Sequence, residues 1–448
     1  MCKTDRYGLN NLFYHYSDRN KAFPSLLDAV ESGGFTDYSP EGIVSFLFYR
    51  YPILKNTMFR DYGRYDTGYR VNEKMYYWKP VFEARDIPIS DAAVVVDEML
   101  TASIGKAVSG AKRVGVTLSG GLDSSVLTAM IKRCFPDVEL YTYSAGFAEL
   151  NEFHYSSKVA GLYSDKHRQF EIAKEEFLRR DSIMDGLIRT KCAPVHPNEI
   201  ALAISENYAI ADNCDIMICG EGADEIFGGY GQILRIPVNY DPEQHGAFHD
   251  FFLSHYLYFS PEEVREILTD KYYLDGRALN RSVFEEPECP KEHDNQIFYF
   301  LQRIHGRGLY ERFDNTFKFT GIPGAFPFLD DSLSDFVNSL PFDYKVRWKD
   351  GIDLAEASKL PFRQISENYD IPKYILKLVA EKYLPKDIVY RNKIAFPVPY
   401  ENWFAGDNDI TLNSDIFKIR DLSSLSGWKK FMLLNVNRLF EIFNEYRR

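Results

Sequence analysis

The loop SGGLDSS, at positions 119–125, lies between a β-branched run and an apolar stretch with helical periodicity. The run RVGVTL at 113–118 predicts a strand, and SVLTAMIKRC at 125–134 predicts a helix. A glycine pair lets the backbone turn tightly so that its N–H groups converge, and the following helix points the positive end of its dipole at the loop. The pattern therefore predicts an α/β unit with a site for a phosphate group at its turn.

The alternation of strands and helices continues beyond this loop. Candidate strands are VELYTYSAGF at 138–147, HRQFEI at 167–172 and DIMIC at 215–219, with helical stretches between them. Strands that alternate with helices predict parallel βαβ units, so we expect an α/β fold with a parallel sheet and helices on both faces. From about residue 240 onward strands are hard to find, which predicts a C-terminal helical layer on the α/β core.

Residues 1–88 differ from the rest of the sequence. They are rich in Tyr, Phe, Arg and Asp, and Pro and Gly break their short apolar runs, so we expect a small α+β unit. From Asp91 to Val108 apolar residues recur at near-helical spacing, which predicts an amphipathic helix leading into the strand at 113–118. We place the main domain boundary near residue 88, with a second domain over 89–448.

Composition excludes several classes of protein. Lys and Arg number 53 and Asp and Glu 65, so the net charge is −12, and such a chain lacks the positive field that nucleic acid requires. No stretch approaches the roughly 18 uncharged apolar residues of a membrane span, and the N-terminus has no apolar signal region. We therefore expect a cytoplasmic protein without nucleic-acid or membrane partners. The six cysteines form no CxxC pair, which indicates reduced thiols.

Asp123 lies inside the loop, where direct contact with a phosphate would bring like charges together. A carboxylate here suits a bridging Mg²⁺ instead, which implies a metal–nucleotide substrate. The loop contains no lysine and is therefore not a Walker A motif, so the positive charge must come from elsewhere. The structural alternative is a glycine-rich turn whose Ser and Asp residues only cap the helix.

Four segments together resemble a known family. SGGLDSS resembles the pyrophosphatase-type loop of ATP-using enzymes that cleave between the α- and β-phosphates, and the chain looks like the synthetase domain of asparagine synthetases. CGEGADEIFGGY at 219–230, PFLDDSLSDFVNSLP at 327–341 and KYILKLVAEKYLPKDIVYRNKIAFPVP at 373–399 resemble the other family signatures in family order. The resemblance covers about residues 90 to 405 and implies the adenine nucleotide alpha hydrolase-like fold.

The resemblance implies roles for particular residues. It assigns ATP and pyrophosphate binding to Leu118, Ser119, Gly120, Gly121, Asp123, Ser124, Ser125, Cys219 and Gly220. Asp123 and Asp224 would hold Mg²⁺, and Glu221 would face the reacting carboxylate or the incoming amine. Lys393 would contact the phosphates and stabilise the charge that develops as pyrophosphate leaves.

Other acidic residues in these segments have open roles, and one segment departs from the family. Asp330 is either a substrate-site residue or a helix cap, and Asp314 is either a substrate contact or an ordinary helix residue. Asparagine synthetases usually carry a Glu and an Arg just before PFLD, where this chain has Pro323 and Ala325. The loss of these two charged residues near the binding site of the acceptor substrate puts aspartate in doubt as the carboxylate substrate.

The N-terminal segment matches only part of a glutaminase. Glutamine-dependent family members begin Met-Cys-Gly and use the cysteine as nucleophile, whereas this chain begins Met-Cys-Lys and places SGGLDSS at 119. Residues 38–80 resemble the closing part of a glutaminase domain and its linker, so we interpret Cys2 as a coincidental thiol. The nitrogen would then come from free ammonia, from a separate glutaminase subunit or from an amine already on a substrate.

These expectations converge on an ATP-dependent, AMP- and pyrophosphate-forming amide ligase. It would adenylate a small-molecule or peptide carboxylate and pass it to ammonia or an amine, with ATP and Mg²⁺ as cofactors. A variant of this hypothesis is a synthetase that closes a lactam or a peptide ring. A different class is a catalytically inactive nucleotide-binding scaffold, and chemistry on tRNA fits poorly with the negative charge. A homodimer is compatible with all of them.

Overall fold

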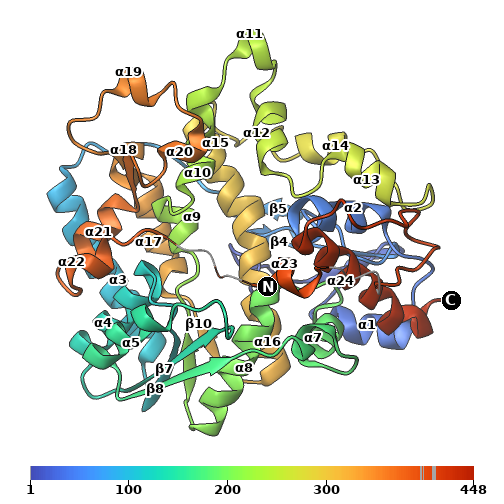
Figure 1. The fold of residues 1–448 in the computed structure, drawn as a ribbon, viewed down its shortest axis with the longest axis horizontal. Coiled ribbons are helices and arrows are strands. Elements are labelled where there is room, and N and C mark those ends of the chain that lie inside the picture. Colours follow the sequence, from blue (N-terminus) through green and yellow to red (C-terminus); the bar gives the residue numbers. More distant parts are fainter. Residues whose placement is uncertain (1, 394–395, 397, 406–409) are drawn as a thin grey trace.

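The central sheet is parallel, as the sequence predicts, and it has five strands, of which four were expected and β10 was not. The structure is a computed structural model that describes residues 2–393, 396, 398–405 and 410–448. In the order β10-β9-β6-β7-β8, the strands are β10 (Gly324–Ala325), β9 (Ile216–Ile218), β6 (Arg113–Thr117), β7 (Glu139–Gly146) and β8 (Lys166–Glu171). In Figure 1 this sheet lies at the lower side of the molecule, next to α8 and α16.

The order of the strands determines where a ligand can bind. From β6 the chain adds β7 and then β8 on one side, and it later returns to place β9 on the other side of β6. The connections after β6 and β9 therefore leave the sheet in opposite directions, which opens a crevice at the carboxyl ends of these two strands. The segment that begins at Leu118 and the segment that begins at Cys219 meet at this crevice.

Helices cover both faces of the sheet, which confirms the expected fold class. On one face Val114 and Val116 of β6 share a buried cluster with α3 (Ile89–Val108) and α4 (Leu122–Cys134), and α5 (Phe153–Tyr163) packs beside them. On the other face Tyr143 and Met217 share a cluster with α7 (Ile183–Lys191) and α8 (Pro197–Ala211). Helix α16 (Gly306–Thr320) packs on α8 and runs through the centre of the molecule.

The chain after residue 240 is mostly helical, as expected. Its helices include α11 (Pro242–His245), α12 (Phe248–Tyr256), α13 (Pro261–Ile267), α14 (Arg277–Arg281), α15 (His293–Phe300), the π-helical turn η2 (Leu301–His305), α17 (Asp331–Asn338), α18 (Phe342–Lys345), α19 (Leu354–Ala357), α20 (Phe362–Ile365), α21 (Tyr374–Ala380), α22 (Lys386–Val389), α23 (Tyr400–Trp403) and α24 (Gly427–Phe443). Short strands also occur here, namely β10, β11 (Val346–Trp348) and β12 (Asp370–Pro372), and they are too short for an alternating pattern to reveal them. In the part of the chain that the structure describes, no helix combines the length and apolarity needed to cross a membrane.

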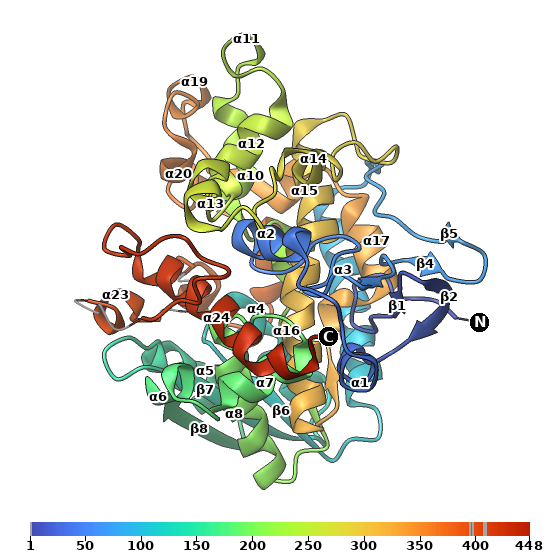
Figure 2. The ribbon, with the colours of Figure 1, turned by 90° about the vertical axis from the view of Figure 1, so that its right-hand side faces the viewer.

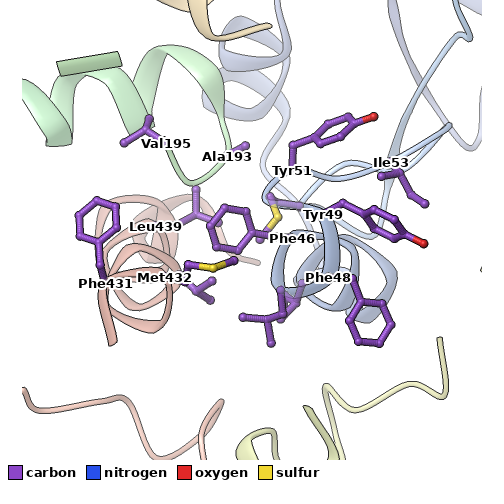
Figure 3. Close-up of a cluster of buried hydrophobic side chains, with 14 of the residues drawn as sticks. Phe46, Phe48, Tyr49, Tyr51, Ile53, Ala193, Val195, Phe431, Met432 and Leu439 are labelled. Atoms are coloured by element: carbon purple, nitrogen blue, oxygen red, sulfur yellow. The ribbon is translucent and has the colours of Figure 1, made fainter. Parts of the chain in front are cut away.

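The N-terminal segment is an α+β unit that shares its core with the rest of the chain. It contains the sheet β2-β1-β3 (Asp18–Phe23, Phe13–His15, Tyr62–Arg64) and the helices α1 (Leu26–Gly33) and α2 (Pro40–Tyr49). Figure 2 shows α24, in red, next to the blue helix α1. Tyr38 stacks on Phe440 of α24 with ring centroids 3.5 Å apart, and Figure 3 shows α2, α24 and the segment around Val195 packed in one apolar cluster.

Buried charges also join the N-terminal segment to the central helix. Asp66 accepts hydrogen bonds from Arg303 of η2 at 2.7 Å and from Arg307 of α16 at 3.1 Å. Arg64, the last residue of β3, pairs with Glu311 of α16. All five side chains are buried, so the unit cannot separate from α16 without exposing or unpairing several charges.

Candidate active site

A cavity of about 730 Å³ opens at the carboxyl ends of β6 and β9, where the strand order predicts a binding site. Its volume lies within the usual range for small-molecule sites, about 300–1,000 Å³. Most of the residues predicted from the sequence line its wall, namely Leu118, Ser119, Gly121, Asp123, Ser124, Cys219, Gly220, Glu221, Asp224 and Lys393. Gly120 belongs to the same loop, and Ser125 is fully buried behind it; neither is among the described residues that line the cavity.

The loop after β6 is held in a fixed shape by its own serines. The N–H groups of Ser119 and Gly121 donate to Ser124 Oγ and Ser119 Oγ, each at 3.2 Å. Gly120 has φ +75°, and a Cβ atom there would lie 2.7 Å from the backbone nitrogen of Ser156, so both the conformation and the space require glycine. Helix α4 begins at Leu122 without a side-chain cap, which leaves its first N–H groups free for an anion.

Two lysines and two aspartates meet beneath this loop. Lys373 Nζ lies 2.5 Å from Asp123 Oδ2 and 2.5 Å from Asp224 Oδ1, and Lys393 Nζ lies 2.6 Å from Asp224 Oδ2. Although burial opposes ionisation, Lys373 and Lys393 lower the pKa of the Asp224 carboxyl. Burial raises the pKa of Asp123, and Lys373 counteracts this shift. Two lysine side chains and two aspartate side chains therefore share one small region of the cavity wall.

Sequence reasoning missed Lys373, the more central of the two lysines. It stands at the start of α21 with φ +54° and is buried, so its ammonium group is fixed between the two carboxylates. Gly229 provides the space, because a Cβ atom at this position would lie 1.8 Å from Asp224 Oδ1 and 2.2 Å from Lys373 Cε. The signal in the sequence was that Lys373 opens the KYILKL segment, but an isolated lysine is usually a surface residue.

Arg391 is a second cation that the sequence did not reveal. Its Nη1 donates to the carbonyl oxygen of Gly120 at 2.9 Å, and its other amino group pairs with Glu152. Its guanidinium lies 4.0 Å from the ring centroid of Tyr155. The segment that carries Lys393 is thereby attached to the loop at 119–125, so the two segments are positioned together.

Glu221 lines the same cavity without an ion-pair partner within 4 Å among the described residues. Burial, and then the charge of Asp224, raises the pKa of Glu221 to about 7. Arg312 and Lys393 act in the opposite direction. A carboxyl group with this pKa can exchange a proton with a ligand near neutral pH.

The structure places the remaining candidates away from the cavity. Asp330 caps α17 by accepting from the N–H groups of Ser332 and Leu333, and it also pairs with Lys106, so the helix-cap alternative describes it. Asp314 pairs with Lys318 one turn along α16 at 2.7 Å, which describes an ordinary helix residue.

Three further positions from the sequence lie in the framework of the protein. Pro323 and Ala325 flank Gly324 at the edge of the sheet, where their carbonyl oxygens accept from the N–H groups of Met217 and Cys219. Proline is tolerated at an edge because no partner strand needs its missing N–H. Cys2 packs against a small N-terminal cluster around Tyr14, Tyr65 and Val71.

Comparison with known protein families gives one decisive match. Residues 95–436 match the sequence model of the asparagine synthase family, which is well over half of the 448 residues. The chain belongs to the asparagine synthase family. The matched region contains both crevice segments, both lysines and Arg391, so the family resemblance and the cavity involve the same part of the molecule.

Individual relatives in the asparagine synthase family are distant. The chain is 25% identical to a putative glutamine-hydrolysing asparagine synthetase of Mycobacterium tuberculosis, over 91% of this chain and 66% of that protein. It is also 25% identical to asparagine synthetase 1 of Bacillus subtilis, over 66% of this chain and 48% of that protein. The chain thus spans less than two thirds of the length of these relatives.

Solved structures resemble this family member only weakly. A U34-tRNA thiolase of Methanococcus maripaludis matches 54% of this chain and 89% of its own, with 13% identity and a TM-score of 0.25. The NAD⁺ synthetase of Burkholderia pseudomallei matches 56% of this chain and 87% of its own, with 14% identity and a TM-score of 0.22. Scores this low support no conclusion about function.

Proposed function

We propose that this protein is an ATP-dependent carbon–nitrogen ligase that forms AMP and pyrophosphate. It would activate a carboxylate as an acyl-adenylate and transfer the acyl group to ammonia or an amine. The observation that carries the proposal is the group of Lys373, Lys393, Asp123 and Asp224 beneath an open helix N-terminus in one cavity. Membership of the asparagine synthase family supports the same class of reaction.

In the first step a carboxylate oxygen of the substrate attacks the α-phosphorus of ATP. The bond between this phosphorus and the oxygen bridging to the β-phosphate breaks, and pyrophosphate leaves with the electron pair. The first N–H groups of α4 and the ammonium groups of Lys373 and Lys393 are placed to stabilise the negative charge that accumulates on the leaving group. Fixed donors of this kind need no reorganisation during the reaction.

In the second step the amine nitrogen attacks the carbonyl carbon of the acyl-adenylate, and the bond to AMP breaks. The attacking nitrogen must lose a proton, and Glu221 is the candidate base because it lines the cavity and its pKa is raised to about 7. Burial is the main cause of this raised pKa, and the negative charge of Asp224, three positions along the chain, adds to it.

The two aspartates fit a magnesium ion that accompanies the nucleotide. Both present hard carboxylate oxygens, and both already bind one cation, the Lys373 ammonium, from opposite crevice segments. The described residues contain no cluster of three or more candidate metal ligands, and Mg²⁺ typically needs only one or two carboxylates when substrate phosphates supply the rest. When bound, the ion would neutralise charge on the β- and γ-phosphates.

The first experiment asks which bond of ATP breaks. The full chain with ATP, Mg²⁺ and a panel of carboxylic acids should release pyrophosphate and AMP when the right acid is present. Release of ADP would contradict the proposal, as would binding of ATP without turnover across a broad panel, which is the outcome expected of a scaffold. Ammonium and glutamine should be compared as nitrogen donors, with and without a separate glutaminase.

The second experiment tests the role of Lys393 in turnover. Lys393→Met should reduce turnover by about 100-fold or more, as loss of one preorganised charge in an active site usually does, while ATP binding changes much less. Lys386→Met is the matched control, because Lys386 on α22 is exposed and lies outside the cavity wall. Equal turnover in the two variants would remove Lys393 from the mechanism.

A further inference from the structure

A second hollow lies beside the segment that connects the N-terminal unit to the rest of the chain. Its volume is about 480 Å³, and none of its described lining residues belongs to the active-site cavity. One wall follows the hairpin of β4 (Tyr69–Arg70) and β5 (Met75–Tyr76). In Figure 2, β5 lies at one side of the molecule and β8 of the central sheet at the other. We name this hollow the linker groove and define it by residues 76–83, Glu288, Pro290 and Glu292.

Aromatic rings line the linker groove and are held in place by their polar ends. The rings are those of Tyr76, Tyr77, Trp78 and Phe82. Tyr76 Oη donates to Asp66 at 2.8 Å. Tyr77 Oη donates to the carbonyl oxygen of Thr4 at 2.8 Å. Beside these rings Val81 is 60% exposed, which is unusual for so apolar a side chain. The groove therefore offers a preorganised apolar surface to a ligand.

The main chain along the same wall has free hydrogen-bonding groups. Residues 78–88 form no helix or strand. From residue 79 to residue 84 no N–H or C=O group bonds to the main chain of another described residue, and the pairing resumes where Arg85 N–H donates to Ser339 at 2.8 Å. Unpaired main-chain groups in an open wall are the groups to which an added extended segment binds. A polypeptide matches this wall better than a ligand without peptide groups.

The charges around the linker groove are mostly negative. Lys79 is the one cation among its described lining residues, and its Nζ lies 2.7 Å from Glu288 and 3.3 Å from Glu286. Glu83 and Glu292 are exposed and form no ion pair with a described residue. The stretch 283–294 contains five acidic residues and one lysine. The groove thus has unpaired carboxylates beside an apolar surface, which is complementary to a positively charged ligand with apolar side chains.

We propose that the linker groove binds an extended, positively charged segment of another polypeptide. The basic side chains of this segment pair with Glu83, Glu288 and Glu292, and its apolar side chains pack on the aromatic rings. Its main chain pairs with residues 79–84. Successive side chains of an extended segment point to opposite sides, so alternating basic and apolar residues satisfy both kinds of contact. The inference goes beyond the ligase function and does not depend on it, because the groove and the active-site cavity have separate walls.

The first test uses short fluorescent peptides of defined sequence, with anisotropy as the measure of binding to the full chain. One peptide alternates lysine with valine. The others replace every lysine by glutamine, every lysine by glutamate, or every valine by serine. The Lys–Val peptide should bind at least about tenfold more tightly than each of the others, and its affinity should fall as the salt concentration rises. Equal affinity of the Lys–Val and Gln–Val peptides would overturn the proposal.

Two further probes decide whether the ligand is a polypeptide. The Lys–Val peptide methylated on alternate main-chain nitrogens keeps its charges and loses N–H donors, so it should bind about tenfold more weakly. Spermidine is a flexible cation without peptide groups, and it should not displace the Lys–Val peptide at equal concentration. Undiminished binding of the methylated peptide, or displacement by an equal concentration of spermidine, would show that the groove recognises positive charge alone.

Variants then assign the binding to the linker groove. Glu83→Lys combined with Glu292→Lys reverses two exposed charges, so the melting temperature should stay close to that of the wild type. This double variant should bind the Lys–Val peptide at least about tenfold more weakly and should prefer the Glu–Val peptide. Val81→Ser should weaken binding of the Lys–Val peptide more than that of the Lys–Ser peptide. The matched control is Glu98→Lys combined with Glu243→Lys, which makes the same change in net charge at exposed positions outside the groove.

The remaining outcomes are equally decisive. An equal loss of binding in the two double variants would assign it to the net charge of the protein and overturn the proposal. Light scattering tests a second copy of this chain as the occupant. The molar mass should be the same for the wild type and the groove variant, and a dimer that dissociates only in the groove variant would assign the groove to self-association instead. All binding is measured without ATP, so a failure of the ligase function leaves this test intact.

Discussion

Lys373 Nζ lies 2.5 Å from Asp123 Oδ2, although 250 positions separate the two residues along the chain. The same ammonium group contacts Asp224, so one lysine from the C-terminal layer joins the two loops that leave the sheet at β6 and β9. The carboxylates are thus brought together by a cation that belongs to the protein. A metal ion that arrives with the nucleotide would have to share these two carboxylates with Lys373. The contacts of this lysine should therefore change when metal and nucleotide bind.

Replacing Lys373 should expose the metal-binding capacity of the carboxylates. Lys373→Met leaves Asp123 and Asp224 without their shared cation, and losing one partner of such a buried group typically costs about 3–5 kcal/mol of unfolding free energy. Without nucleotide, Mg²⁺ should raise the melting temperature of the variant more than that of the wild type, because the ion can replace the ammonium. Lys382→Met, which removes the half-exposed pair with Asp97, is the control. An equal response to Mg²⁺ in all three proteins would argue against a metal at these aspartates.

The second prediction concerns the pH dependence of turnover. Burial and the Asp224 charge raise the pKa of Glu221 to about 7, and a general base acts only when it is deprotonated. With the acyl-adenylate preformed, the rate of amine transfer should therefore rise as the pH increases from 6 to 8 with an inflection near 7. Glu221→Gln should transfer slowly at every pH and lose this inflection, while pyrophosphate exchange persists. An inflection that survives in the Gln variant would assign the titration to another group.

The sequence predicted the part of this site that is continuous along the chain. Strand, loop and helix around Gly121 follow from local residue types, and the alternation of strands and helices places the loops after β6 and β9 at one edge of the sheet. Local rules are sufficient for this part of the site because the strand, the loop and the helix are made of neighbouring residues in the sequence.

The sequence could not reveal residues whose importance depends on where a distant element packs. Lys373 and Arg312 are single cations in helical segments, where exposed charges are the normal interpretation. Only the packing of α21 against α3 and of α16 against α8 buries them and places them in the cavity wall. The strand at 324–325 escaped prediction for a related reason, since two residues form a strand only because β9 is beside them.

A buried glutamate on α8 should make the stability of the protein fall as the pH rises. Burial raises the pKa of Glu206 to about 8, and the hydroxyl groups of Thr316 and Thr320 donate to its carboxyl. Between about pH 5 and 8 the folded state therefore holds a proton that the unfolded state has released, so stability decreases with pH across this window.

Glu206→Gln removes this titration. Its unfolding free energy should be similar to that of the wild type at pH 5 and higher by on the order of 3 kcal/mol at pH 8.5, as urea unfolding at the two values would measure. Glu98→Gln, at an exposed position on α3, should leave the pH dependence unchanged. A wild type whose stability is constant from pH 5 to 8.5 would show that this carboxyl is already ionised in the folded protein.

The last prediction concerns the connection between the N-terminal unit and the rest of the chain. Asp66 is buried between Arg303 and Arg307, and these two charges lower the pKa of its carboxyl against the effect of burial. Asp66→Asn removes the charge and should cost about 3–5 kcal/mol of unfolding free energy, since two buried guanidinium groups lose their shared partner. Residues 1–88 share a core with α24 and ion pairs with α16. The loss of stability should therefore extend beyond residues 1–88. Hydrogen exchange followed by mass spectrometry should show faster exchange both in residues 13–64 and in α16, whereas Asp18→Asn, on the exposed strand β2, should change neither. Faster exchange in the N-terminal segment alone would show that it unfolds as an independent domain.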